Sequence, residues 1–499
     1  MNRRRFVQST VAAAIAATLP IGRNYAAILS GSMRVDADVN AVTGAGAEVT
    51  LKRAAVQELG DSLRGNLLLP GHEAYEEARR VLNASINKHP ALIVQPKGTA
   101  DVRNAVDFAR ESNLLVAVKC GGHSPSGKST CDGGMMIDLS LLRSVRVDPV
   151  RRVAQVSGGS WLGDMDHDTM NFGLVTTAGT VSHTGVGGLT LGGGFGRLAR
   201  RFGLAVDNVR GVDLVTADGK FVRAYPDENP DLYWGIRGGG GNFGVVTNFE
   251  FQLHPMQRQV VGGSIGFPMS EAKQILNFVA EYSANAPDEL YFDGGIVSTP
   301  GEFSGAMIQI CYSGPMSKAE KILATIRKAG TPIFDDIAPI DYVALQKSGD
   351  IDDPRARGAW MKSGFVSEIT PAMIDTIIDG FEEHPDRGMV VWWQHAGGAI
   401  NRVATDATAF VHRYVKHDTL FLMDWAIGVD PAPHIQWLRE YFATVEPFTH
   451  GFYTNDVMDE SQRSVNRNYQ GNYERLALLK TQYDPTNLFR LNANIVPGV

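Results

Sequence analysis

Three glycine-rich segments hold the side chains whose types and spacing best fit a chemical role. The first is Val-Lys-Cys-Gly-Gly-His-Ser at 118–124, the second spans 178–196, and the third spans 231–244. In the first, glycines let backbone N–H groups come close to a pyrophosphate and expose the next side chain, His123. A lone histidine after two glycines is more often an ordinary loop residue. Because all three segments occur in this order, we predict a binding site for a phosphate-bearing cofactor.

Other catalytic motifs fail in their context. The third segment contains GxGxxG at 239–244, but a strand-like run at 245–251 follows where a dinucleotide site needs a helix, so NAD binding is disfavoured. Ser124 and Ser160 lack the two flanking glycines of a serine nucleophile. The chain has no CxxC and no HExxH, so we expect no metal site.

The segments around the first glycines predict an α/β beginning. An apolar run from Leu92 is followed by an amphipathic segment at 102–111 and a second apolar run at 114–118. A strand, a helix and a strand with short links form a parallel crossover unit. Alternation at 145–156 and the turn residues at 217–220 predict further strands.

Beyond about residue 260 the pattern changes to longer strands separated by helices. Strand-like runs lie at 291–297, 307–312, 389–395 and 420–425, and helical ones at 272–282, 318–329 and 469–479. This order predicts a second domain with an antiparallel sheet and helices on one face, and an α+β chain as a whole.

Length, charge and cysteine content exclude several classes of protein. The 499 residues, 44% of them hydrophobic, allow a large buried core. The formal net charge is −7, and it becomes −11 without the first 27 residues, which hold four arginines and no acidic residue. Nucleic acids are bound by clustered Lys and Arg, so we expect no nucleic-acid partner. Three cysteines are too few for a disulfide framework in a chain of this length.

The N-terminus predicts export. Residues 1–27 combine Arg3-Arg4-Arg5, an apolar stretch at 11–19 and small residues at 26–27, which resembles a twin-arginine signal peptide. A basic amphipathic helix is the alternative. Residues 28–48 are expected to be a flexible lead-in. No later stretch of about 18 apolar residues occurs, so we expect no stable membrane insertion and a periplasmic or secreted protein.

The C-terminal segment completes the set of motifs. It reads Asn-Tyr-Glu-Arg-Leu at 472–476, Tyr-Asp-Pro at 483–485 and Asn-Ala-Asn-Ile at 492–495. With the three glycine-rich segments, the chain resembles the berberine-bridge-enzyme-like flavoproteins of the vanillyl-alcohol-oxidase, or PCMH-type, superfamily from about residue 88 onward. The resemblance implies an FAD-binding domain of two α/β lobes at 49–257, a substrate domain at 258–450, and a C-terminal segment at 451–499 that returns to the FAD domain.

The resemblance also implies how the flavin is held. His123 would be bonded to the flavin 8-methyl carbon, and the position of the cysteine that makes a second bond in many relatives is Val181 here, so one covalent bond is expected. Cys120 and Cys131 do not align with that cysteine. The residues expected to bind FAD are Lys119, Gly121, Gly122, His123, Ser124, Gly179, Thr180, His183, Thr184, Gly187, Gly188, Gly244, Val245, Asn492 and Asn494.

The strand at 390–395 resembles the family strand that faces the flavin across the substrate. With period two, Trp392 and Gln394 share one face, and Trp393 and His395 share the other. Gln394 stands where relatives often carry a glutamate base, and an amide cannot take a proton near neutral pH. Tyr453 is therefore the candidate base, provided that a nearby cation lowers its pKa; an amine substrate that needs no base is the alternative.

Two neighbouring residues after Ala409 and Phe410 match a further family signature. His412 and Arg413 are expected to pair with carboxylates rather than act on substrate.

The function implied is an FAD-dependent oxidase or dehydrogenase. It would take a hydride from a carbon bearing oxygen or nitrogen in an aromatic, alkaloid-like or saccharide molecule, and O2 or another acceptor would reoxidise the flavin. A flavin-containing protein that sequesters a small molecule without turnover stays open as the alternative, because Gln394 replaces the carboxylate.

Overall fold

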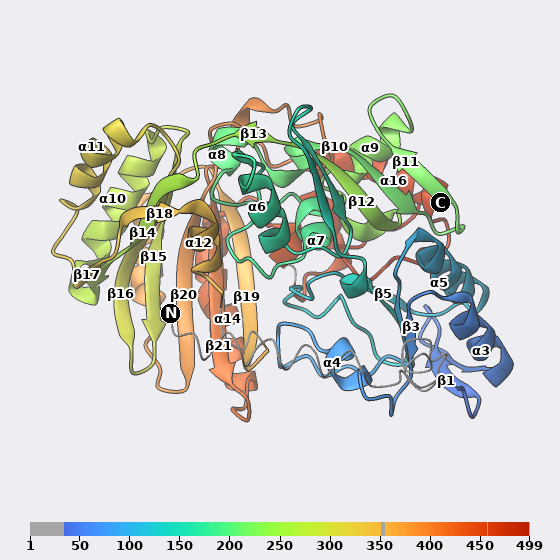
Figure 1. Cartoon of the computed structure of the whole chain (residues 1–499). Helices are drawn as coiled ribbons and strands as arrows, with labels where there is room; N and C mark the ends of the chain where they lie inside the picture. The colour runs from blue at the N-terminus through green and yellow to red at the C-terminus, as the bar shows by residue number, and fades with distance from the viewer. Residues whose placement is uncertain (1–33, 351–354, 457, 499) are drawn as a thin grey trace, which may run out of the picture.

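The computed structural model describes residues 34–350, 355–456 and 458–498. The signal peptide predicted at 1–27 lies outside these residues. Figure 1 shows a long twisted sheet with helices beside it, joined to a second body made of two smaller lobes.

The first lobe is built on a four-stranded sheet in the order β3-β4-β6-β5, in which β4, β6 and β5 are parallel. Helix α5 connects β4 to β5, so the predicted strand-helix-strand unit is confirmed. The elements are α3 (Arg53–Ser62), β3 (Asn66–Leu68), α4 (Tyr75–Arg79), β4 (Leu92–Gln95), α5 (Thr99–Glu111), β5 (Val116–Lys119) and β6 (Met135–Asp138).

The lead-in predicted to be flexible over 28–48 is wrong from residue 39 onward. β1 (Val39–Val42) pairs antiparallel with β2 (Glu48–Leu51), and Ala41 is buried in the core of the first lobe. The small residues around Gly44 and Gly46 made this stretch look like a linker. They form the turn of a hairpin whose strand β1 bonds the lobe through Val42 N and the Gly133 carbonyl.

The second lobe is an antiparallel five-stranded sheet in the order β11-β10-β12-β8-β7. Its last strand in the sequence, β12, begins directly after Gly244, which confirms that the GxGxxG segment lacks the following helix of a dinucleotide site. The strands are β7 (Val145–Asp148), β8 (Val153–Ser157), β10 (Val209–Val215), β11 (Phe221–Ala224) and β12 (Val245–Gln252). The helices are α6 (Leu162–Met170), α7 (Val186–Leu191), α8 (Ala199–Phe202) and α9 (Pro230–Ile236).

The second domain is an antiparallel sheet with helices packed on one face. Its strand order is β17-β14-β16-β15-β20-β21-β19, and β18 pairs with β14. The short strands β9 (Leu174–Val175) and β13 (His254–Pro255) pair with each other, and the chain enters this sheet directly after β13, at β14. The strands are β14 (Gln259–Pro268), β15 (Leu290–Thr299), β16 (Phe303–Tyr312), β17 (Phe334–Asp335), β18 (Ala338–Asp341), β19 (Arg357–Val366), β20 (Arg387–His395) and β21 (His417–Ala426).

The largest core lies between this sheet and four helices. Phe292, Trp393 and Phe421 point into it from three strands. The helices are α10 (Ala272–Ala284), α11 (Met316–Ile326), α13 (Pro371–Gly380) and α14 (Ala432–Val445). A fifth helix, α12 (Tyr342–Lys347), instead packs against α6 of the second lobe. Within the described residues, no helix has the length and apolar character needed to cross a membrane.

The C-terminal segment packs on the second lobe. It contains α15 (Gln462–Asn468) and α16 (Tyr473–Tyr483), whose Leu476 and Leu479 lie in the core of that lobe. Asn242, from the third glycine-rich segment, donates to the Ala493 carbonyl and accepts from Ile495 N. The buried Lys480 donates to the Asn242 carbonyl, the Phe489 carbonyl and Asp484. The third segment therefore anchors the chain end.

Candidate active site

The first two glycine-rich segments pack directly against each other. A Cβ on Gly121 would lie 2.3 Å from the backbone N of Gly185, and a Cβ on Gly185 would lie 2.3 Å from the backbone N of Gly121. Any side chain at either position would push the two loops apart, because real Cβ atoms do not approach a backbone atom so closely. The glycines therefore bring His123 next to His183.

His123 has a partner at each ring nitrogen. Its Nε2 lies 2.7 Å from Nδ1 of His183, and its Nδ1 lies 3.2 Å from the Thr184 hydroxyl. Burial lowers the pKa of His123 to about 3, with a smaller contribution from His183. The imidazole is therefore neutral at physiological pH, and a neutral ring nitrogen is the form that can act as a nucleophile.

The surroundings of this pair fit a ligand rich in polar groups. Among the described residues, three of the predicted cofactor residues have a buried side-chain atom without a hydrogen-bond partner, namely His183 Nε2, Asn492 Oδ1 and Asn494 Oδ1, and so do Ser126, Ser129 and Thr130 just after the first segment. Buried polar atoms in proteins are nearly always satisfied, so this set indicates a missing partner. Gly188 is exposed, and no atom lies within 4 Å of where its Cβ would be. These features fit FAD.

Several predicted cofactor residues have visible structural roles. The Lys119 ammonium donates to the Ala78 carbonyl at 2.5 Å and lies 3.7 Å from Asp138. The side chain of Val245 is buried in the core of the first lobe. A Cβ on Gly244, where φ is +155°, would meet the Val215 carbonyl at 2.5 Å. These contacts account for the residue types of Lys119, Gly244 and Val245 without any contact to a cofactor.

The remaining predicted cofactor residues shape the two loops. The carbonyl of Gly179 accepts from the Gln346 amide, and that of Thr180 accepts from Arg197. Gly122 has φ +72°, and Ser124 Oγ accepts from Lys128 N. The position of a Cβ on Gly187 is 3.0 Å from the Gly158 carbonyl. Tight loop packing accounts for these glycines.

Strand β20 divides its side chains between two faces, as predicted. Trp393 is 1% exposed in the core under the helices, and His395 is also buried. Trp392 and Gln394 are half-buried on the opposite face. The residues of β20 predicted to meet substrate thus lie away from the helices.

A buried network that the sequence analysis missed holds these two residues. Asp293 on β15 accepts from Trp392 Nε1 at 3.0 Å, from His395 N at 2.7 Å, and from the Tyr291 hydroxyl. The Gln394 amide donates to the same hydroxyl at 3.4 Å. Burial raises the pKa of Asp293 to about 7. An acidic residue inside an apolar strand-like run was the available signal.

Tyr453 does not meet the condition for a base. Its buried hydroxyl accepts from Gly194 N at 2.9 Å and from the Asn455 amide at 2.7 Å. Burial raises the pKa of the phenol, and the charge of Asp456 raises it further. The prediction required a cation that lowers the pKa of Tyr453. The charged groups that act on Tyr453 are instead carboxylates, which raise it.

Two further acidic residues lie on this side of the sheet, and the sequence analysis missed both. Asp418 stands opposite Gln394 in the β20–β21 pairing, and it is 2% exposed. Asp456 is half-buried three residues after Tyr453, next to Ser363. Burial raises the pKa of Asp456 to about 7, and that of Asp418 is also raised.

The predicted carboxylate pairing is confirmed for Arg413 and wrong for His412. Arg413 makes two 2.8 Å hydrogen bonds to Asp207. His412 Nε2 instead lies 3.1 Å from the side-chain oxygen of Asn468, because the C-terminal helix α15 covers it with a neutral residue.

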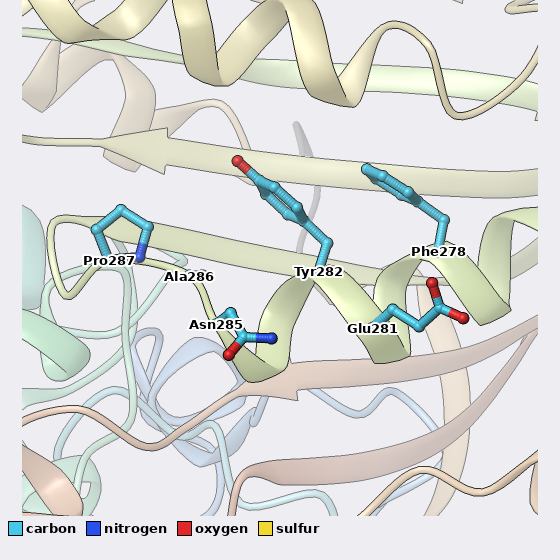
Figure 2. A pocket seen from close by; sticks show the side chains of 6 residues that line it. All are labelled: Phe278, Glu281, Tyr282, Asn285, Ala286 and Pro287. Atoms are coloured by element: carbon cyan, nitrogen blue, oxygen red, sulfur yellow. The ribbon is translucent and has the colours of Figure 1, made fainter.

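Figure 2 shows a pocket at the C-terminal end of α10, lined by Phe278, Glu281, Tyr282, Asn285, Ala286 and Pro287. Phe278 and Tyr282 pack on Phe292, the core-facing neighbour of Asp293. The sheet therefore separates this pocket from Trp392 and Gln394. No group of three or more His, Cys, Asp or Glu that could hold a metal occurs among the described residues.

Comparisons with known proteins match this architecture. Residues 90–225 match the family model of an FAD binding domain, and 453–496 match that of berberine and berberine-like proteins. An FAD-linked oxidoreductase of Dictyostelium discoideum is 34% identical over 447 residues, which is 89% of this chain and 97% of the relative. The (R)-6-hydroxynicotine oxidase of Paenarthrobacter nicotinovorans is 30% identical, covering 87% and 97%. A chitooligosaccharide oxidase structure, 24% identical, aligns over 89% of this chain and 100% of its own with a TM-score of 0.80.

Proposed function

Because the chain belongs to the berberine-like family of FAD-linked oxidoreductases, we propose that it takes a hydride from a C–O or C–N carbon of a small molecule by means of FAD bonded to His123 alone. The substrate class at this level is aromatic, alkaloid-like or saccharide. Its enzymatic class is that of an FAD-dependent oxidoreductase acting on alcohol or amine groups. The observation that carries the proposal is the neutral His123 imidazole between His183 and Thr184, inside loops with unsatisfied polar atoms.

The chain's own residues would hold the cofactor and orient the substrate. FAD, when bound, supplies the acceptor for the hydride. His123 would tether it, and the closely packed glycines at 121 and 185 would keep that histidine in place. Gln394 Nε2 donates to the Tyr291 hydroxyl, so the Gln394 side-chain oxygen would be the atom that accepts a hydrogen bond from a substrate hydroxyl or amine.

The covalent bond is tested by denaturation. After acid precipitation the wild-type protein should stay yellow, and His123→Ala should release its flavin to the supernatant. Peptide mapping should find one flavin-bearing peptide, which contains His123, and none that contains Val181. Complete release of FAD from denatured wild-type protein would refute the covalent proposal.

The sequestering alternative rested on the missing carboxylate at Gln394. Asp418 stands directly opposite that residue, so a carboxyl group is present on this face after all. Anaerobic addition of alcohols and amines, with loss of flavin absorbance as the readout, separates turnover from storage. An oxygen electrode then tells whether O2 is the acceptor.

Export is part of the proposal. The Arg3-Arg4-Arg5 run and the apolar stretch at 11–19 support a twin-arginine signal and a periplasmic or secreted enzyme. Changing Arg3 and Arg4 to Lys should keep the protein in the cytoplasm of a bacterial host, as measured by cell fractionation.

A further inference from the structure

We propose that Asp418 is the subsite for a cationic group, so that the substrate is a protonated amine rather than a neutral alcohol or saccharide. This inference rests on the proposed function. It concerns a residue that lies outside the motifs of the glycine-rich segments and of the C-terminal segment.

The strand pairings place Asp418 on the substrate side of the sheet. It stands opposite Gln394 on β20 and opposite Phe365 on β19. Directly opposed residues of an antiparallel sheet share a face, and residues two apart along a strand share it too. On β21 the core residues Thr419 and Phe421 alternate with Asp418, so the carboxylate points away from the helices. It lies beside the residue predicted to meet substrate.

The carboxylate lacks the partner that a buried charge needs. Asp418 Oδ1 is fully buried and accepts no hydrogen bond from any residue that the structure describes. Directly opposite it are Gln394 on β20 and Phe365 on β19. The charged groups that act on it are Asp456 and Asp293, and both are acidic. A buried carboxylate persists when it is paired or hydrogen-bonded, but the described residues that act on Asp418 include no cation, so its raised pKa favours the protonated form until a cation binds.

An ammonium group supplies what is missing. It would donate to the unsatisfied oxygen of Asp418 and to the free carbonyl oxygen of Gln394. A hydroxyl group can donate one hydrogen bond but brings no positive charge, so it does not favour the ionised form of Asp418 as an ammonium group does. The site therefore favours amines.

The same contact provides a base for the reaction. The carboxylate of Asp418 takes one proton from the ammonium, which leaves a neutral amine with a free nitrogen lone pair. FAD, when bound, would supply the two-electron acceptor for the hydride of the α-carbon, so that the amine is oxidised to an iminium cation, and Asp418 would keep the proton that it took from the ammonium. Gln394 need not act as a base in this scheme.

A matched pair of ligands tests the subsite in the purified flavin-loaded protein. Benzylamine and benzyl alcohol share one ring and differ in charge, and their binding is measured by the change in flavin absorbance under anaerobic conditions. We expect benzylamine to bind at least about ten-fold more tightly than benzyl alcohol. Equal affinity, or failure of benzylamine to bind, would overturn the proposal without any variant.

Variants then assign the preference to one residue. Asp418→Asn should raise the Kd of benzylamine by about ten-fold or more and leave that of benzyl alcohol nearly unchanged, whereas Asp418→Glu should keep part of the preference. Asp424→Asn is the control, because Asp424 lies on the same strand and pairs with Arg357. An amine preference that survives Asp418→Asn contradicts the assignment. The covalent flavin content of each variant, read from in-gel fluorescence, tests the proposed function separately.

Discussion

At the scale of single residues, the proposed bond between His123 and the flavin depends on the contact between His123 and His183. The 2.7 Å approach of His183 Nδ1 fixes the ring orientation of His123, and the neutral state of both rings lets a proton pass between them. We therefore expect His183→Phe, which keeps a ring but removes both nitrogens, to bind FAD with a reduced covalent fraction. The measurement is acid-precipitable flavin divided by total flavin, with Thr184→Val as the comparison. An unchanged fraction in His183→Phe would show that His183 only fills space.

Tyr453 gives a second prediction at this scale. Its hydroxyl is the acceptor for Gly194 N and the Asn455 amide, so Tyr453→Phe removes the side-chain acceptor of the buried Gly194 N and one of two acceptors of the Asn455 amide. This should lower the free energy of unfolding by about 1–3 kcal/mol, as measured by denaturant titration. The raised pKa of the phenol argues against proton abstraction, so the rate of flavin reduction should fall by less than about ten-fold. A fall of about 100-fold with unchanged substrate affinity would restore Tyr453 as the base.

At the scale of elements, the sequence predicted where strands form better than it predicted which strands lie side by side in the sheet. The apolar run at 389–395 is β20 and the run at 420–425 lies within β21, because alternation is a local property of the chain. The carboxyl groups of Asp293 and Asp418 were missed because only the order β15-β20-β21-β19, which places strands out of sequence order, brings them to one face of the sheet. Asp456 was missed because it lies in the turn Thr454–Asp456, which only the fold brings next to Ser363 of β19. The register of the strands depends on packing across the sheet, and no single segment encodes it.

His417 on β21 gives a prediction for this element. It is 3% exposed and stacked on His395, and neither of its ring nitrogens has a hydrogen-bond partner among the described residues. Burial lowers its pKa to about 3, so between pH 6.5 and 3 His417 is protonated in the unfolded chain and neutral in the folded chain. The free energy of unfolding therefore falls as the pH falls through this range.

His417→Leu removes both this pH-dependent contribution to stability and the unsatisfied ring nitrogens. The difference in free energy of unfolding between the variant and the wild type should therefore favour the variant by about 2 kcal/mol more at pH 5 than at pH 7.5. Thermal unfolding at the two pH values measures the difference. A stability difference that is the same at both would mean that His417 is protonated in the fold.

At the scale of the whole molecule, the two domains are joined by polar contacts that only the folded chain brings together. Arg197 of the second lobe donates to Gln346 on α12, and Gln346 donates to Asp166 on α6. Arg413, which follows the 397–412 connection from β20, makes its paired bonds with Asp207 of the second lobe, and both side chains are nearly inaccessible. That Arg413 meets a carboxylate was predictable from its type, but which one was not, since Asp207 lies 206 residues away.

Breaking the Arg413 pair should destabilise the molecule more than removing its charges together. Arg413→Met leaves the carboxylate of Asp207 buried without its cation, and the expected cost is about 3–5 kcal/mol of unfolding free energy. Adding Asp207→Asn removes that stranded charge but keeps a side-chain oxygen that can accept from Leu204 N, as Asp207 does now. The double variant should therefore be more stable than Arg413→Met alone by at least about 1 kcal/mol. Denaturant titration of the wild type, both single variants and the double variant measures the coupling. Additive costs would mean that the pair positions the loop without contributing through its charges.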